Sequence, residues 1–183
     1  MTHPRYEALA KRNLWDELVQ IRDQQRKDKE SAVFVVSGDD LPWEVNPMGM
    51  MRWYTHPEVH DTAVRSLIFY VQKILPGSQS GLLKFPGGQV IHILDGKGHT
   101  VIDGVKLHWE AGDVLQLPMR WDGIVHQHFN DDPKNPAEFL AVQANFVHSL
   151  GVDKGQGFEL LTACPEYQEK ARASRRQARE KTD

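Results

Sequence analysis

The first thirty residues repeat apolar positions at steps of three and four, with charged residues between them. This spacing is typical of an amphipathic helix, and it predicts one helix over roughly residues 5–28. The apolar positions are Tyr6, Leu9, Ala10, Leu14, Leu18 and Ile21. A helix with such an apolar stripe is expected to pack against another part of the protein.

From Ala32 onward the pattern changes to short runs of β-branched, aliphatic and aromatic residues, separated by Gly, Pro and Asp. The runs are AVFVV, MMRWY, SLIFYVQKIL, GLLKF, QVIHIL, HTVID, DVLQL, IVHQHF and EFLAVQANFV. Asp95-Gly96 and Asp103-Gly104 are dipeptides that accept positive φ in tight hairpins. Many closely spaced strands without intervening helices predict an all-β antiparallel sandwich or barrel. After Cys164 the chain becomes polar, which indicates a helical or frayed tail.

Length and composition limit the protein class. The 183 residues, with 40% hydrophobic and 26% charged residues, are enough for one domain with a full core. No apolar run approaches the roughly 20 residues that span a bilayer, and the N-terminus lacks the apolar stretch of a secretory signal. We therefore expect a cytoplasmic protein without a membrane partner. The lone Cys164 agrees with a reducing compartment and is interpreted as a packed residue, not a nucleophile.

The charge distribution makes nucleic acid an improbable partner. Residues 31–164 hold nine Lys/Arg against fifteen Asp/Glu, so the central body is acidic. Histidine is the unusual residue of this region, since six of the nine histidines lie between residues 90 and 150. Their density raises the question of a metal site. They are His92, His99, His108, His126, His128 and His148.

The stretch PGSQSGLLKFPGGQVIHILDGKGHTVIDGVKLHWEAGDVLQLP, with the later HQHFN, resembles the two barrel motifs of the cupin superfamily. The amino-acid sequence is similar to that of gentisate 1,2-dioxygenase and its relatives, over roughly residues 45–148. The resemblance implies a single cupin barrel, also called a double-stranded β-helix or jelly roll. We expect an N-terminal helical extension (residues 1–31), the barrel (32–150) and a C-terminal segment with a charged tail (151–183).

The first motif keeps the family's spacing of glycines but lacks the family's metal ligands. The resemblance places Leu83 and Phe85 where the family has two histidines, and Gln89 where it has a glutamate. Leucine and phenylalanine offer no lone pair to a non-haem iron, which needs about three imidazole or carboxylate ligands. Period-two geometry puts both side chains on one strand face, and the resemblance makes that face the barrel interior. The usual three-histidine site is therefore absent.

The second motif supplies the remaining candidates. His126-Gln127-His128 resembles the family's later ligand segment, with His126 as the expected equivalent of the ligand. Either histidine could be an acid/base residue or a partial ligand for a divalent metal such as Fe, Mn, Ni or Zn. The alternative is a buried imidazole that bonds to a carbonyl or to Gln89. The loop before His126 is about three residues longer than the family's. Within it, Arg120 could pair with a carboxylate and Trp121 could form a pocket wall.

The other histidines carry weaker expectations. His92 is expected on the opposite strand face, although a site rebuilt from His92, His126 and His128 is a third hypothesis. His99 and His108 are expected to face solvent beside a hairpin, and His148 is expected to be structural. His56 and His60 are four apart, but a proline lies between them and the metalloprotease glutamate is missing, so a helical zinc motif is disfavoured.

Two functions remain open at this point. One is a cupin that binds a small aromatic or carboxylated molecule, as an enzyme related to gentisate-type dioxygenases, with Leu83, Phe85, Gln89, Arg120 and Trp121 as ligand-binding residues. The other is a metal-free cupin with a binding or regulatory role. Gentisate enzymes have two barrels and this chain has room for one, so an actual gentisate dioxygenase is disfavoured. We further expect a homodimer that pairs through residues 32–54.

Overall fold

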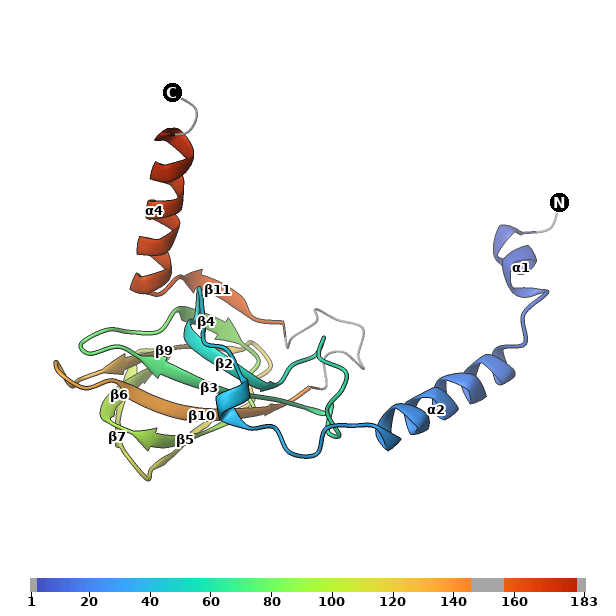
Figure 1. Ribbon diagram of the computed structural model, residues 1–183, viewed down its shortest axis with the longest axis horizontal. Helices are drawn as coiled ribbons and strands as arrows, with labels where there is room; N and C mark the ends of the chain where they lie inside the picture. Colours follow the sequence, from blue (N-terminus) through green and yellow to red (C-terminus); the bar gives the residue numbers. More distant parts are fainter. Residues whose placement is uncertain (1–2, 146–156, 181–183) are drawn as a thin grey trace. The chain divides into compact units, whose positions relative to one another are not determined.

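The computed structural model describes residues 3–145 and 157–180, and the side chains up to residue 175. The chain divides into two compact units, one formed by residues 1–35 with 61–63 and the other by residues 36–60 with 64–183. Figure 1 shows the helices and strands of both units. None of the described helices is long and apolar enough to span a membrane.

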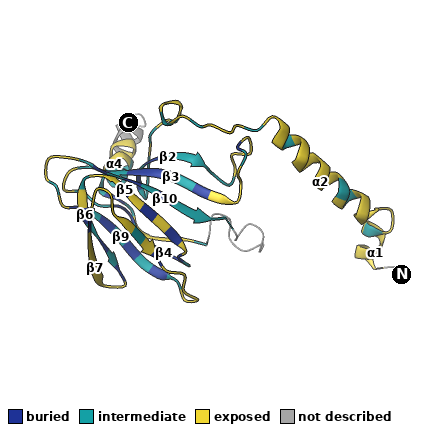
Figure 2. Ribbon diagram, turned by 90° about the horizontal axis from the view of Figure 1, so that it is seen from below, coloured by how far each residue is buried: buried dark blue, intermediate teal, exposed yellow. Residues whose placement is uncertain are grey.

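The N-terminal unit contains two helices where the sequence pattern predicts one. They are α1 (Pro4–Leu9) and α2 (Leu14–Glu30). The prediction of an unbroken helix is wrong because the side chain of Asn13 caps a new helix, accepting a hydrogen bond from the Asp16 N–H at 3.3 Å. Neither helix has a buried residue, and both are coloured yellow and teal in Figure 2.

The predicted strand at residues 32–36 is absent from the structure. Only Val33 forms a β-bridge, a parallel one with Thr62, and the chain continues without a ladder. Phe34 and Val35 are 80% and 85% exposed. High β-propensity is not sufficient here, because a strand is stabilised by its partner and its buried face.

The second unit is built from two antiparallel sheets. The six-stranded sheet has the order β1-β2-β3-β10-β5-β8, and the five-stranded sheet has the order β11-β4-β9-β6-β7. The strands of the first sheet are β1 (Glu44–Asn46), β2 (Gly49–Thr55), β3 (Leu67–Ile74), β5 (Gln89–Asp95), β8 (Val114–Leu117) and β10 (Ala137–Ala144). Those of the second are β4 (Leu82–Phe85), β6 (Lys97–Ile102), β7 (Val105–Glu110), β9 (Ile124–Asn130) and β11 (Glu159–Thr162). A short 3₁₀ helix, η1 (Gly38–Asp40), precedes β1.

The core lies between the two sheets and is formed by every second side chain along the strands. Buried residues alternate with exposed ones along β5 and with half-buried ones along β9, and the dark blue segments of Figure 2 mark buried residues. The core cluster contains Met51, Ile68, Tyr70, Ile74, Phe85, Ile91, Ile93, Ile102, Trp109, Leu117, Ile124, Ala137, Phe139 and Ala141. Two facing antiparallel sheets around one core confirm the predicted all-β jelly-roll barrel.

One of the two predicted hairpins is present. Asp103-Gly104 joins β6 to β7 with φ values of 47° and 85°, as a two-residue turn of the primed type requires. Asp95-Gly96 does not form a hairpin, because β5 and β6 belong to different sheets. Gly96 has a φ of 84°, so this dipeptide turns the chain from one sheet to the other.

The C-terminal segment adds an edge strand and a helix. β11 pairs with β4, and α4 (Pro165–Glu180) follows. Of the two predicted forms of the tail, helical or frayed, the structure has the helical one. Ser78 Oγ lies 2.5 Å from Glu166 Oε1, and the Cys164 N–H donates to the Pro47 carbonyl at 2.9 Å. Cys164 is fully buried, and burial raises the pKa of its thiol, which agrees with a packed residue.

Candidate functional site

The candidate site begins on two neighbouring strands of the five-stranded sheet. His126 and His128 are both buried on the inward face of β9, and Leu83 and Phe85 are buried on the inward face of β4. The antiparallel register places Leu83 directly opposite His126. Each pair of residues two positions apart thus shares one strand face, as the sequence predicts. Leu83 and Phe85 lie next to the imidazoles inside the barrel.

These strands border a cavity of about 90 Å³ between the two sheets. Its wall is mainly apolar and aromatic, and strands of both sheets contribute to it. The lining residues are Met48, Trp53, His56, Pro57, Ile68, Tyr70, Leu83, Phe85, Gln89, His126, Gln143 and Phe158. Phe158 is half exposed, so the cavity is open to solvent on that side.

A small amide cluster forms the polar part of the wall. Gln89 Nε2 donates to Tyr70 Oη at 2.9 Å and to Gln143 Oε1 at 2.8 Å. Both amide hydrogens of Gln89 are thereby used, and its Oε1 atom is left buried without a hydrogen-bond partner. Burial raises the pKa of Tyr70 to about 12, so its hydroxyl stays protonated.

His126 is the second wall residue with an unpartnered polar atom. Its Nδ1 atom is buried and has no hydrogen-bond partner. Burial lowers its pKa to about 4, and the negative charge of Asp103 offsets this only in part. At neutral pH the ring is therefore an uncharged imidazole, 4.9 Å from the Phe85 ring between centroids.

His128 lies on the same strand face but outside the cavity wall. Its Nδ1 atom is 2.7 Å from Thr100 Oγ1, which also accepts a hydrogen bond from Trp109 Nε1 at 3.0 Å. Its ring packs edge-on against Phe139, at 4.9 Å between centroids. Burial holds its pKa well below the usual value for histidine. The two predicted catalytic histidines thus differ, because only His126 borders the cavity.

The predicted pocket wall in the longer loop is wrong. The indole of Trp121 is 99% exposed, so it cannot enclose a ligand in this arrangement. Arg120 forms an ion pair with Asp103 at 2.6 Å, and neither loop residue lines the cavity. The longer loop therefore does not extend the site, and no residue pattern in it indicates the direction in which it leaves the barrel.

The remaining histidines are distributed around the barrel. His92 is exposed on the outer face of β5, which rules out the site rebuilt from His92, His126 and His128. His56 lines the cavity, a position that the sequence analysis missed. His99 and His108 lie beside Asp131 at the far edge of the five-stranded sheet. His148 is outside the described residues.

Several wall residues were not predicted, although the pattern contains a signal for some of them. On β3 the residues Ile68, Tyr70 and Gln72 are buried at every second position. The same alternation that puts Leu83 and Phe85 on one strand face could have put Tyr70 on a common face with Ile68. Trp53 and Gln143 continue the buried faces of β2 and β10, two residues after the buried Met51 and Ala141, at the point where the alternation gives way to intermediate burial.

Comparisons with known proteins agree with this architecture. A family model described as "Cupin domain" matches residues 70–143. A 5-aminosalicylate 1,2-dioxygenase from a Comamonas species is 24% identical over 110 residues, which are 60% of this chain and 28% of that protein. The chain thus spans little more than a quarter of this curated relative.

Two solved structures show the same fold at low sequence identity. The polyketide cyclase RemF from Streptomyces resistomycificus has a TM-score of 0.54 at 12% identity, over 70% of this chain and 85% of that one. Salicylate 1,2-dioxygenase from Pseudoaminobacter salicylatoxidans has a TM-score of 0.52 at 15% identity, over 66% of this chain and 31% of that one. These two enzymes differ in the reactions that their names describe, so the likeness supports the fold alone.

Proposed function

We propose that the barrel, in which residues 70–143 match a cupin domain model, binds a small, uncharged aromatic molecule that carries at least one hydrogen-bond donor. A single observation supports this proposal best. Two polar atoms in a mainly apolar wall, Gln89 Oε1 and His126 Nδ1, are buried and have no partner. A buried polar atom without a partner costs about 1–3 kcal/mol, which a bound ligand would recover.

The shape and lining of the cavity favour an aromatic ligand. Trp53, Tyr70 and Phe85 contribute aromatic rings to the wall. A closed cavity of about 150 Å³ accommodates benzene, and the volume here is about 90 Å³ with an open side next to Phe158. A ligand with one ring therefore fits if part of it occupies the open side. A larger ring system does not fit without rearrangement of the wall.

The polar atoms specify the ligand's functional group. Gln89 Oε1 can only accept a hydrogen bond, so the ligand has to donate one, as a phenolic hydroxyl or an amine does. The neutral His126 imidazole can accept or donate, depending on its tautomer. A carboxylate is disfavoured at this depth, because none of the described residues that line the cavity is cationic and an unpaired buried charge is costly. Of the two expected ligand classes, the proposal keeps the aromatic one.

The proposal includes no metal ion in the barrel. The imidazole donors at the cavity and on the inward face of β9 are His56, His126 and His128, and Leu83 and Phe85 offer none. Among the described residues, no three His, Cys, Asp or Glu side chains converge in the barrel. These residues do not fit a site that requires about three imidazole or carboxylate ligands. His128 is in addition engaged with Thr100. We therefore propose a binding or regulatory role without metal-dependent chemistry.

Titration calorimetry with phenol, benzoate and toluene tests the ligand class. We expect phenol to bind more tightly than benzoate, and His126→Leu to weaken phenol binding about tenfold, the equivalent of one net hydrogen bond. Toluene binding should be unaffected by this substitution. His92→Leu, on the outer face of β5, is the matched control. Benzoate binding as tight as that of phenol, or phenol binding unchanged in His126→Leu, would contradict the proposal.

A second candidate function follows from the similarity to the 5-aminosalicylate dioxygenase. An enzyme of that type would consume dioxygen with 5-aminosalicylate or gentisate, both of which carry a carboxylate. Oxygen uptake by the purified chain, measured with either compound after addition of Fe²⁺, distinguishes the two functions. We expect no uptake above the protein-free rate, whereas turnover abolished by His126→Leu would establish the enzyme and refute our first proposal.

We also propose that the protein is a homodimer and is cytoplasmic. Within the segment predicted as the contact, residues 32–54, the side chains of Phe34 and Val35 are largely exposed. Exposed apolar side chains of this kind are common in subunit interfaces. Light scattering during gel filtration would give the mass of two chains for the wild type. Phe34→Ser together with Val35→Ser should shift it to one chain.

A further inference from the structure

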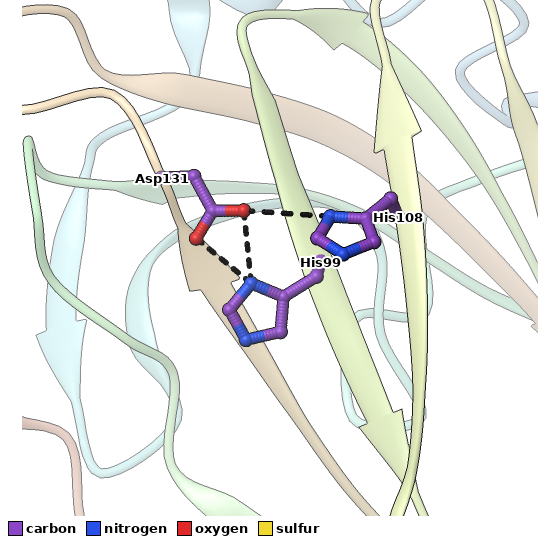
Figure 3. Close-up of side chains that lie close together, drawn as sticks. All are labelled: His99, His108 and Asp131. Atoms are coloured by element: carbon purple, nitrogen blue, oxygen red, sulfur yellow. Dashed lines mark hydrogen bonds and ion pairs between the residues drawn. The ribbon is translucent and has the colours of Figure 1, made fainter.

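A second group of chemically active side chains lies at the edge of the five-stranded sheet that carries β7, away from the cavity. The β6–β7 hairpin places His99 directly opposite His108, and Asp131 follows the end of β9, the strand on the other side of β6. Figure 3 shows the two imidazoles and the carboxylate converging on one point. None of the three residues lines the barrel cavity.

The distances between the ligand atoms are those of a compact cluster. His99 Nδ1 lies 2.8 Å and 2.9 Å from the two Asp131 oxygens, and His108 Nδ1 lies 3.7 Å from Asp131 Oδ2. One nitrogen or oxygen of each residue lies within 4.8 Å of those of the other two. It is the one such group of three among residues 3–145 and 157–175. The prediction that both histidines face solvent holds only for His108, since the His99 side chain is 12% exposed.

Part of the cluster is held rigidly. The His99 ring is stacked on Phe129 with centroids 4.6 Å apart and planes inclined by 3°. The ladder between β6 and β7 fixes the backbone of His99 and His108 on adjacent strands. A metal ion at this point would need only small movements of the exposed His108 and Asp131 side chains.

We propose that His99, His108 and Asp131 bind a divalent transition metal ion, with Zn²⁺ as the best match. Two imidazoles and one carboxylate are a common zinc ligand set. Zinc–ligand bonds of about 2.0–2.1 Å in tetrahedral geometry separate the ligand atoms by about 3.3 Å. The observed separations lie on both sides of this value. The fourth position is open to a water molecule or to a donor group of a substrate.

The surroundings of the cluster support a cation on this face. A groove of about 310 Å³ runs beside it and is lined by Lys97, Gly98, His108, Trp109, Glu110, Asp113 and Asp131. Three carboxylates against one ammonium group give the groove a negative potential, which attracts cations. His108 and Asp131 face this groove, so an ion reaches its ligands from solvent without opening the barrel.

Calorimetric titration of the full-length, untagged chain with ZnCl₂, after removal of metals by EDTA and dialysis, tests the site. We expect one zinc ion per chain for the wild type. The substitution His108→Gln should weaken binding by at least about tenfold, and His99→Gln and Asp131→Asn should do the same. The control is His92→Gln, an exposed histidine on the opposite sheet, which should bind zinc as the wild type does.

A titration with Co²⁺ gives a second readout, since tetrahedral cobalt with this ligand set absorbs in the visible region. His108 is 68% exposed, so its replacement should leave the urea midpoint unchanged and keep the test valid. If the wild type binds no zinc at ZnCl₂ concentrations up to about 1 mM, the proposal is overturned. Zinc binding that His108→Gln and Asp131→Asn leave unchanged would overturn it as well.

Discussion

The buried imidazole of His126 should make the stability of the barrel dependent on pH. Its pKa is lowered from 6.5 to about 4, chiefly by burial. The unfolded chain therefore binds a proton in the range between these two values while the folded chain does not. The free energy of unfolding falls as the pH falls from about 6.5 to about 4, and the loss is complete below that.

The expected size of the effect follows from the two pKa values. The full shift corresponds to about 3 kcal/mol, of which about 2 kcal/mol is lost between pH 7.5 and pH 5.0. His128 acts in the same direction, since burial also lowers its pKa. Replacing His126 by Leu removes the His126 part and leaves His128 buried, which is the main cause of its lowered pKa. It also removes the unpartnered Nδ1 atom, so the variant should be more stable than the wild type by about 1–3 kcal/mol at pH 7.5.

Urea denaturation at the two pH values, followed by tryptophan fluorescence, measures both effects. The wild type should lose about 2 kcal/mol more than His126→Leu on going from pH 7.5 to pH 5.0. His92→Leu, which changes an exposed histidine, should retain the pH dependence of the wild type. An equal loss in His126→Leu and the wild type would show that His126 is not a buried neutral imidazole, and the arrangement of β9 would then be wrong.

Three further substitutions test the packing around the site, each measured as a shift of the urea midpoint. Thr100→Val leaves Trp109 Nε1 and His128 Nδ1 without their shared partner and should cost about 2–5 kcal/mol, while Thr100→Ser should restore most of it. Leu83→Ala should cost about 2 kcal/mol, the low end for a buried leucine, because the side chain already borders a cavity. Gly98→Ala should cost about 3 kcal/mol or more, because its Cβ would lie 2.0 Å from a backbone oxygen of β9; Gly104→Ala, with nothing within 4 Å, should cost less.

The sequence pattern predicts what depends on the alternation of side chains along a strand. It puts Leu83 and Phe85 on one strand face, which the resemblance to cupins makes the interior, and it turns His92 to the opposite face of its strand. The structure agrees because both strands have one buried face. It also predicts the turn at Asp103-Gly104, since few residues accept positive φ. Such features are decided by two or three neighbouring residues.

What the pattern does not predict depends on which strands become neighbours. His99 and His108 meet Asp131 because β9 and β7 both pair with β6, and the three residues span more than thirty positions of the chain. The dipeptide Asp95-Gly96 is typical of a hairpin, but β5 and β6 belong to different sheets, and no local pattern indicates this. The difference between His126 and His128 likewise requires the position of Thr100 and of the cavity.

The position of β9 within its sheet has a consequence for local unfolding. β9 is the middle strand of five, with β11 and β7 at the edges. Edge strands open first in native-state fluctuations, and central strands exchange their amide hydrogens only in larger openings. The amides of residues 124–130 should therefore be among the slowest to exchange with deuterium, and those of β7 and β11 among the fastest in this sheet. On this view, His126 keeps its place beside the cavity while the zinc-binding edge at β7 opens and closes on a shorter timescale.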